Sequence, residues 1–241
     1  LPATDAVALE ACRMLLRRYG TAFPVSYREH VDAASAVDDL QRLDRLARVG
    51  PVLSLFRRRG AAPDRLGFKI YRDNAPVPLS DSLPMLERMG VRVLAERPYE
   101  ITPDGGESMW IHDFELEVQA ADELDIEALA PLFEEAFARV LDGRVENDDF
   151  NRLVLKAGLA AEEIVILRAY SKYLRQIGFP LSQAYVETTL AAHPRIAGML
   201  VRLFRLRFDP VERDDAAAAS QVRAIEQALD ACPGDLIDAP D

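Results

Sequence analysis

Cysteine is scarce in this chain of 241 residues, which contains only Cys12 and Cys232. The two lie near opposite ends in no CxxC pair, so neither a disulfide framework nor a thiolate metal site is expected. This usage predicts the reducing cytoplasm as its compartment. Apolar runs of about twenty residues, which a membrane-spanning helix requires, are missing, and the first residues lack the pattern of a signal peptide. We therefore expect no membrane insertion.

Basic residues are outnumbered, with 29 Lys and Arg against 40 Asp and Glu and a formal net charge of -11. Binding to nucleic acid requires a clustered excess of positive charge, so a nucleic-acid partner is not expected. The one basic run is Arg57-Arg58-Arg59. It fits a solvated strand end or turn, or a contact with an acidic neighbouring domain, and we favour the first.

Motifs that carry chemistry are also missing. No GxGxxG, Walker loop, HExxH or GxSxG is present, so NAD binding by this segment is not expected. His30, His112 and His193 are too far apart in sequence to indicate a metal cluster. The sequence predicts no catalytic residue, no cofactor-binding residue and no metal ligand within this segment.

Three regions follow from the hydrophobic periodicity. Residues 1–48 are predicted to be an N-terminal helical segment, with helices over 4–19 and 35–46. Residues 49–145 are predicted to be an α/β domain, with strands over 52–56, 66–71, 91–101 and 109–118 and helices over 79–89 and 125–141. Residues 146–241 are predicted to be a helical module whose helices are separated by Gly158, Gly178 and His193-Pro194.

The order strand, strand, helix, strand, strand, helix is a circular shift of the ferredoxin-like arrangement. It predicts an α+β fold, in which a four-stranded antiparallel sheet carries two helices on one face. In the strand over 109–118, Trp110, His112 and Phe114 share one face. The other face, with Ile111, Asp113, Glu115 and Glu117, is expected to be mostly solvated.

Two groups of segments together resemble the large bacterial NAD-dependent glutamate dehydrogenases. In the α/β region they are FKIYR at 68–72, LSD at 79–81, LPMLE at 83–87, MGVRV at 89–93, ERPY at 96–99 and WIHDF at 110–114. In the helical region they are LRAY at 167–170, YLRQ at 173–176, GFP at 178–180, SQAY at 182–185, AHP at 192–194 and FDP at 208–210. The resemblance covers roughly residues 19–210.

The resemblance implies an ACT-like domain followed by a helical motif, upstream of the catalytic domain. It implies that the parent converts L-glutamate, NAD and water to 2-oxoglutarate, ammonia and NADH, with the NAD site outside this segment. The implied partners are other domains of the same polypeptide and, through a homo-oligomer, further subunits. The resemblance favours an architectural or regulatory role over an independent enzyme.

ACT modules often bind amino acids at a loop between a strand and its following helix, and here that loop spans residues 73–78. It contains two prolines and no glycine, which argues against a ligand, although Asn74, Ser80 and Asp81 offer polar groups. An effector-binding sensor is therefore the alternative reading. His112 and Asp113 are neighbours on a strand and point to opposite faces, so they are not expected to form a catalytic dyad.

Overall fold

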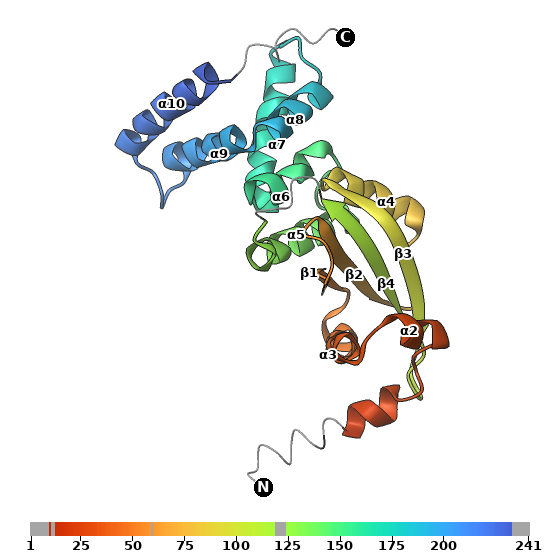
Figure 1. Cartoon of the computed structure of the whole chain (residues 1–241). Coiled ribbons are helices and arrows are strands. Elements are labelled where there is room, and N and C mark those ends of the chain that lie inside the picture. Colours follow the sequence, from red (N-terminus) through yellow and green to blue (C-terminus); the bar gives the residue numbers. More distant parts are fainter. Residues whose placement is uncertain (1–9, 11–12, 59, 119–123, 233–241) are drawn as a thin grey trace. The chain divides into compact units, whose positions relative to one another are not determined.

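The computed structural model describes residues 10, 13–58, 60–118 and 124–232 (Figure 1). The chain forms two compact units, Leu1–Glu87 with Val91–Ala130, and Arg88–Gly90 with Pro131–Asp241. Within the described part, no helix is long and apolar enough to cross a membrane.

The first unit contains a four-stranded antiparallel sheet. Its strands are β1 (Val52–Arg57), β2 (Arg65–Asp73), β3 (Val91–Ile101) and β4 (Met109–Val118), in the spatial order β1-β2-β4-β3. Helix α4 (Leu79–Arg88) connects β2 to β3, and α5 (Ile126–Leu141) follows β4. This order confirms the predicted fold class, because it is the ferredoxin-like sheet with its last strand moved to the front.

The register shift in β3 does not lie at the proline within this strand. Pro98 keeps its register opposite His112, and the pairing shifts between Val93 and Ala95. Because β3 is an edge strand, the missing N–H of proline costs no ladder bond when it faces outward. The bulge instead falls near the start of the strand, where it adds twist.

Helices that precede β1 in the sequence pack against the sheet. Residues 13–19 are helical, and the rest of the helix predicted over 4–19 lies largely outside the described residues. Helix α2 (Val25–His30) was not predicted, whereas α3 (Ala33–Val49) extends the helix predicted over 35–46. Asp32 begins α3 by accepting hydrogen bonds from the N–H groups of Ala34 and Ser35.

Helix α3 packs against β1 and β2, on the sheet face predicted to be mostly solvated. That expectation was wrong, because this face is an apolar core. Its buried members come from the N-terminal region and all four strands: Tyr19, Ala22, Tyr27, Leu43, Leu46, Val52, Tyr71, Tyr99, Ile101, Met109 and Ile111. The periodicity of a strand shows which residues share a face but not which distant helix covers it.

The second unit is all-helical, as predicted. It contains a 3-10 turn η2 (Asp149–Arg152) and helices α6 (Leu153–Ala157), α7 (Ala161–Gln176), α8 (Gln183–Ala192), α9 (Pro194–Phe208) and α10 (Asp215–Asp230). Gly158 and Gly178 adopt positive φ angles of 63° and 80° where α6 and α7 end, which is the conformation that glycine allows most cheaply. His193 ends α8 directly before Pro194 starts α9.

Candidate functional site

A buried charged cluster joins α3 to the sheet. The carboxylate of Asp39 accepts two hydrogen bonds from the Lys69 ammonium, at 2.9 and 2.7 Å. The hydroxyl groups of Tyr27 and Tyr71 each donate to the same carboxylate at 2.6 Å. Both charged side chains are almost fully buried, at 2% exposure for Asp39 and 5% for Lys69. Three elements, α2, α3 and β2, therefore meet at one carboxylate.

The cluster holds its tyrosines in the neutral form. Burial raises the pKa of Tyr27 and of Tyr71 far above the usual value, and the adjacent negative charge of Asp39 raises both further. Asp39 therefore acts as a buried hydrogen-bond acceptor, and the tyrosines act as its donors. Nothing in this arrangement favours a tyrosinate that could serve as a base.

A second ion pair lies on the same face. Lys69 is directly opposite Asp113 in the β2–β4 pairing, and Arg58 forms a short ion pair with Asp113. The Arg58 guanidinium also donates to the carbonyl oxygen of Phe114 at 3.2 Å. We expected the basic run Arg57-Arg58-Arg59 to be solvated, and for Arg58 this was wrong, because its partner is a buried carboxylate of the same sheet. Arg57 is exposed and Arg59 lies outside the described residues.

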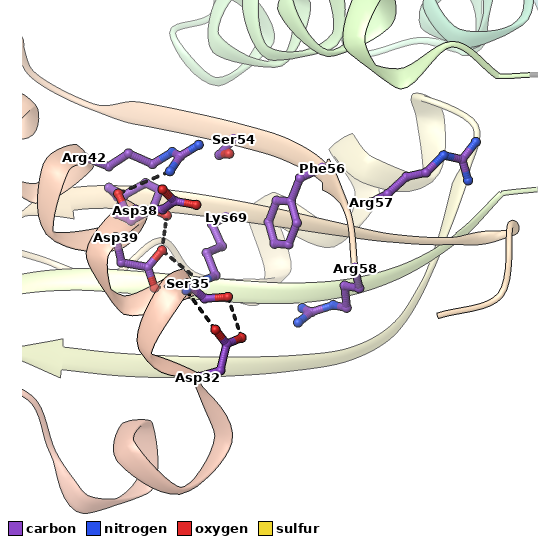
Figure 2. A pocket seen from close by; sticks show the side chains of 11 residues that line it. Asp32, Ser35, Asp38, Asp39, Arg42, Ser54, Phe56, Arg57, Arg58 and Lys69 are labelled. Carbon is purple, nitrogen blue, oxygen red and sulfur yellow. Dashed lines mark hydrogen bonds and ion pairs between the residues drawn. The ribbon is translucent and has the colours of Figure 1, made fainter. Parts of the chain in front are cut away.

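A pocket of about 350 Å³ opens between α3 and the two neighbouring strands (Figure 2). The buried cluster forms part of its wall. Residues of α3 and its cap, β1 and the residue after it, and β2 line it: Asp32, Ser35, Asp38, Asp39, Arg42, Ser54, Phe56, Arg57, Arg58, Lys69 and Tyr71. Sequence reasoning did not single out this pocket. The one visible hint was Lys69, a charged residue within the apolar run of β2.

The predicted effector loop lies on the surface. Asn74, Ser80 and Asp81 are all exposed, and the Ser80 hydroxyl donates to Asp81 at 3.1 Å. Asn74 has a φ angle of 62°, so it adopts the left-handed conformation that glycine usually supplies in such a loop. A role for these three residues in ligand binding stays a prediction.

His112 fixes the end of this loop. Its Nε2 accepts a hydrogen bond from the Val77 N–H at 3.0 Å, so Nδ1 carries the proton and donates to Glu96 at 2.8 Å. The ring is 3% exposed and lies on the sheet face opposite Asp113. His112 therefore positions the backbone before α4 and forms no dyad with Asp113.

The helical unit has its own buried ion pair. Arg168 of α7 donates to both oxygens of Asp148, at 2.8 and 2.9 Å, and to the amide oxygen of Asn151 at 2.6 Å. The two charged side chains are 3% and 8% exposed. This bidentate contact fixes α7 to the 3-10 turn η2 and the residue that precedes it. Among the described residues, no group of three or more His, Cys, Asp or Glu side chains could hold a metal ion.

Three glutamate dehydrogenase modules match consecutive parts of the chain. They are helical motif 2 at residues 10–46, the ACT3 domain at 51–129 and helical motif 3 at 145–210. The sheet described above falls within the ACT3 match.

The chain is also similar to three proteins described as NAD-specific glutamate dehydrogenases. The NAD-specific glutamate dehydrogenase of Halomonas elongata is 46% identical over 205 residues, covering 85% of this chain and 13% of that protein. Its counterpart in Pseudomonas aeruginosa is 40% identical over 195 residues, covering 80% and 12%, and that in Mycobacterium tuberculosis is 38% identical over 222 residues, covering 88% and 14%. The chain thus spans about one eighth of these relatives, and it belongs to the family of the large NAD-specific glutamate dehydrogenases.

Proposed function

We propose that this chain is a non-catalytic architectural and regulatory segment of an NAD-dependent glutamate dehydrogenase. In this proposal it acts through contacts with other domains of its polypeptide and with further subunits of a homo-oligomer. The parent enzyme converts L-glutamate, NAD and water to 2-oxoglutarate, ammonia and NADH in the cytoplasm. The residues that bind NAD and perform the chemistry belong to other parts of the parent.

One observation carries this proposal. The buried charged side chains of the sheet and the buried His112 each have a partner: Lys69 pairs with Asp39, Asp113 with Arg58 and His112 with Glu96. A general acid or base must reach its substrate with a free lone pair or proton. Here these groups instead connect the strands to other strands, to α3 and to the residue after β1, which supports a structural role for them.

Two measurements test the proposal. The 241-residue chain should form no NADH from glutamate and NAD, as followed by absorbance. In the parent enzyme, Lys69→Met should weaken the docking of α3 and lower assembly and turnover, while the KM for glutamate stays unchanged. The matched control is Arg92→Gln, at a side chain that is 76% exposed. NADH formation by the chain alone, or a change confined to KM, would contradict an architectural role.

The alternative is an effector sensor that binds an amino acid at the loop over 73–78. The positive φ angle of Asn74 favours it, because the backbone there makes the turn without glycine. The sensor would need different affinities for two states of the parent enzyme. Substitutions Asn74→Ala, Ser80→Ala and Asp81→Asn should then each weaken amino-acid binding in a thermal-shift titration, and unchanged binding would remove the alternative.

A further inference from the structure

An apolar groove of about 380 Å³ lies between α7, α8 and α9, which contact one another within the helical unit (Figure 1). Its walls are mainly aliphatic, with Leu167, Leu174, Val186, Leu190, Leu200 and Leu203 among the lining residues. Tyr170, Leu181 and Tyr185 also line it and are exposed by 43%, 38% and 39%. Large apolar side chains that stay exposed around a hollow indicate a surface on which another protein segment packs.

The exposed apolar surface continues from the groove along α7. Tyr170, Tyr173 and Ile177 follow the i, i+3, i+7 spacing that places side chains on one face of a helix. Tyr173 is 57% exposed, and Ile177, directly after α7, is 60% exposed. Residues 170–177 span about 10 Å along a helix axis. The apolar surface is therefore elongated, a shape that suits a docked helix better than a small molecule.

One polar group lies among these apolar side chains. Ser171 lines the groove and is 2% exposed, and its hydroxyl oxygen has no hydrogen-bond partner among the described residues. Leaving a buried hydroxyl group unsatisfied costs about 1–3 kcal/mol. A segment that fills the groove therefore gains from a polar side chain at the point that meets Ser171, whereas a purely aliphatic segment leaves this cost in place.

The charged side chains beside the groove are mainly basic. Helix α9, with the sequence PRIAGMLVRLFRLRF, has four arginines and no acidic residue. Arg207 lies one turn beyond the lining residue Leu203, Arg175 follows the lining residue Leu174, and both arginines are exposed. The acidic residues of α7 are confined to its first turn, and Glu187, the one on α8, is buried. These charges favour a partner with carboxylates beside its apolar stripe and disfavour a basic partner.

We propose that this groove docks an amphipathic helix from another part of the parent polypeptide. The helix carries an aliphatic stripe, a polar side chain that meets the Ser171 hydroxyl, and Asp or Glu residues beside the stripe. The proposal rests on the proposed architectural function and gives one of its domain contacts a surface and a chemistry. The helix is sought outside this chain, because the chain covers only 12–14% of its relatives.

Hydroxyl-radical footprinting tests whether the parent enzyme covers the groove. Tyr170, Tyr173 and Tyr185 are exposed in the 241-residue chain and should be oxidised readily there. In the parent enzyme their oxidation rates should fall roughly threefold or more, because the core of an interface excludes water. Unchanged rates would overturn the proposal. The NADH and Lys69→Met measurements do not depend on these tyrosines, so the architectural function and the groove can fail separately.

Sedimentation of the isolated chain tests a second copy as the occupant. The chain should be monomeric, with Tyr170, Tyr173 and Tyr185 reactive. A dimer in which these tyrosines are protected would overturn the proposal and assign the groove to a contact between copies.

Charge-reversal variants of the parent enzyme test the acidic partner. Arg207→Glu and Arg175→Glu should each raise the oxidation rates of Tyr170 and Tyr185 toward those of the isolated chain, since a carboxylate there repels an acidic helix. Arg223→Glu is the matched control, at an exposed arginine of α10 outside the groove lining, and should leave the tyrosines protected. Circular dichroism of the same variants in the isolated chain confirms that they fold. Protection that survives both Arg207→Glu and Arg175→Glu would overturn the acidic partner.

Discussion

Removing the ammonium group of Lys69 should damage the first unit more than removing the whole charge pair. In Lys69→Met the Asp39 carboxylate stays buried at 2% exposure and keeps only the hydroxyl groups of Tyr27 and Tyr71 as donors. Breaking a buried pair in this way costs about 3–5 kcal/mol of unfolding free energy. This is a large share of the roughly 5–15 kcal/mol that stabilises an ordinary domain.

The double variant Lys69→Met with Asp39→Asn provides the comparison. A neutral amide needs no counter-charge, and its oxygen still accepts from a tyrosine, so about 2 kcal/mol or more of the loss should be recovered. Trp110 on β4 is the only tryptophan in the chain, and its fluorescence during urea unfolding reports on the sheet. The reasoning fails if the single variant loses less than about 1 kcal/mol, or if the double variant is no more stable than the single one.

Three further outcomes are expected. Because the pKa values of Tyr27 and Tyr71 are raised in the folded state, both tyrosines keep protons that the unfolded chain loses above about pH 10. Above that pH the free energy of unfolding, measured by urea titration, should therefore fall by about 1.4 kcal/mol per pH unit for each tyrosine. A free energy that does not change with pH in this range would contradict the cluster. In Gly67→Ala the new Cβ would lie 2.4 Å from the Phe56 ring, so this half-buried ring must move. The free energy of unfolding, followed by tryptophan fluorescence, should fall by about 1 kcal/mol. Adding Phe56→Leu should restore part of that loss. Asp214→Ala removes the acceptor for two N–H groups at the start of α10 and should cost about 1 kcal/mol in circular-dichroism melts without shifting the Trp110 transition.

Local patterns predicted most of the secondary structure. Alternation in 66–71 and 109–118 indicated strands, and glycines such as Gly158 and Gly178 marked helix ends, because these patterns depend on residues close together in sequence. The ferredoxin-like order followed from the sequence of elements alone. The short helix α2 escaped notice because six residues carry too few turns to show a period.

The polar side chains of the first unit were less predictable. From the sequence, Asp39 looks like an ordinary solvent-facing charge on an amphipathic helix, and Asp113 looks like a residue on the solvated face of a strand. Their burial depends on residues 30 and 55 positions away, Lys69 and Arg58. Only Lys69, between the apolar Phe68 and Ile70, carried a local sign of burial. The pocket went unpredicted for the same reason, since its residues come from three separated stretches of chain.

The convergence of hydrogen bonds on Asp39 also determines where this protein can be divided. Matches to helical motif 2 end at residue 46 and those to the ACT3 domain begin at residue 51, so a boundary between them looks natural in sequence. A domain cut at that point would keep Lys69 and Tyr71 but lose the carboxylate that they share. The sheet would then present an unpaired ammonium beside an uncovered apolar face. The smallest fragment that keeps this cluster intact therefore includes α2 and α3 together with the sheet.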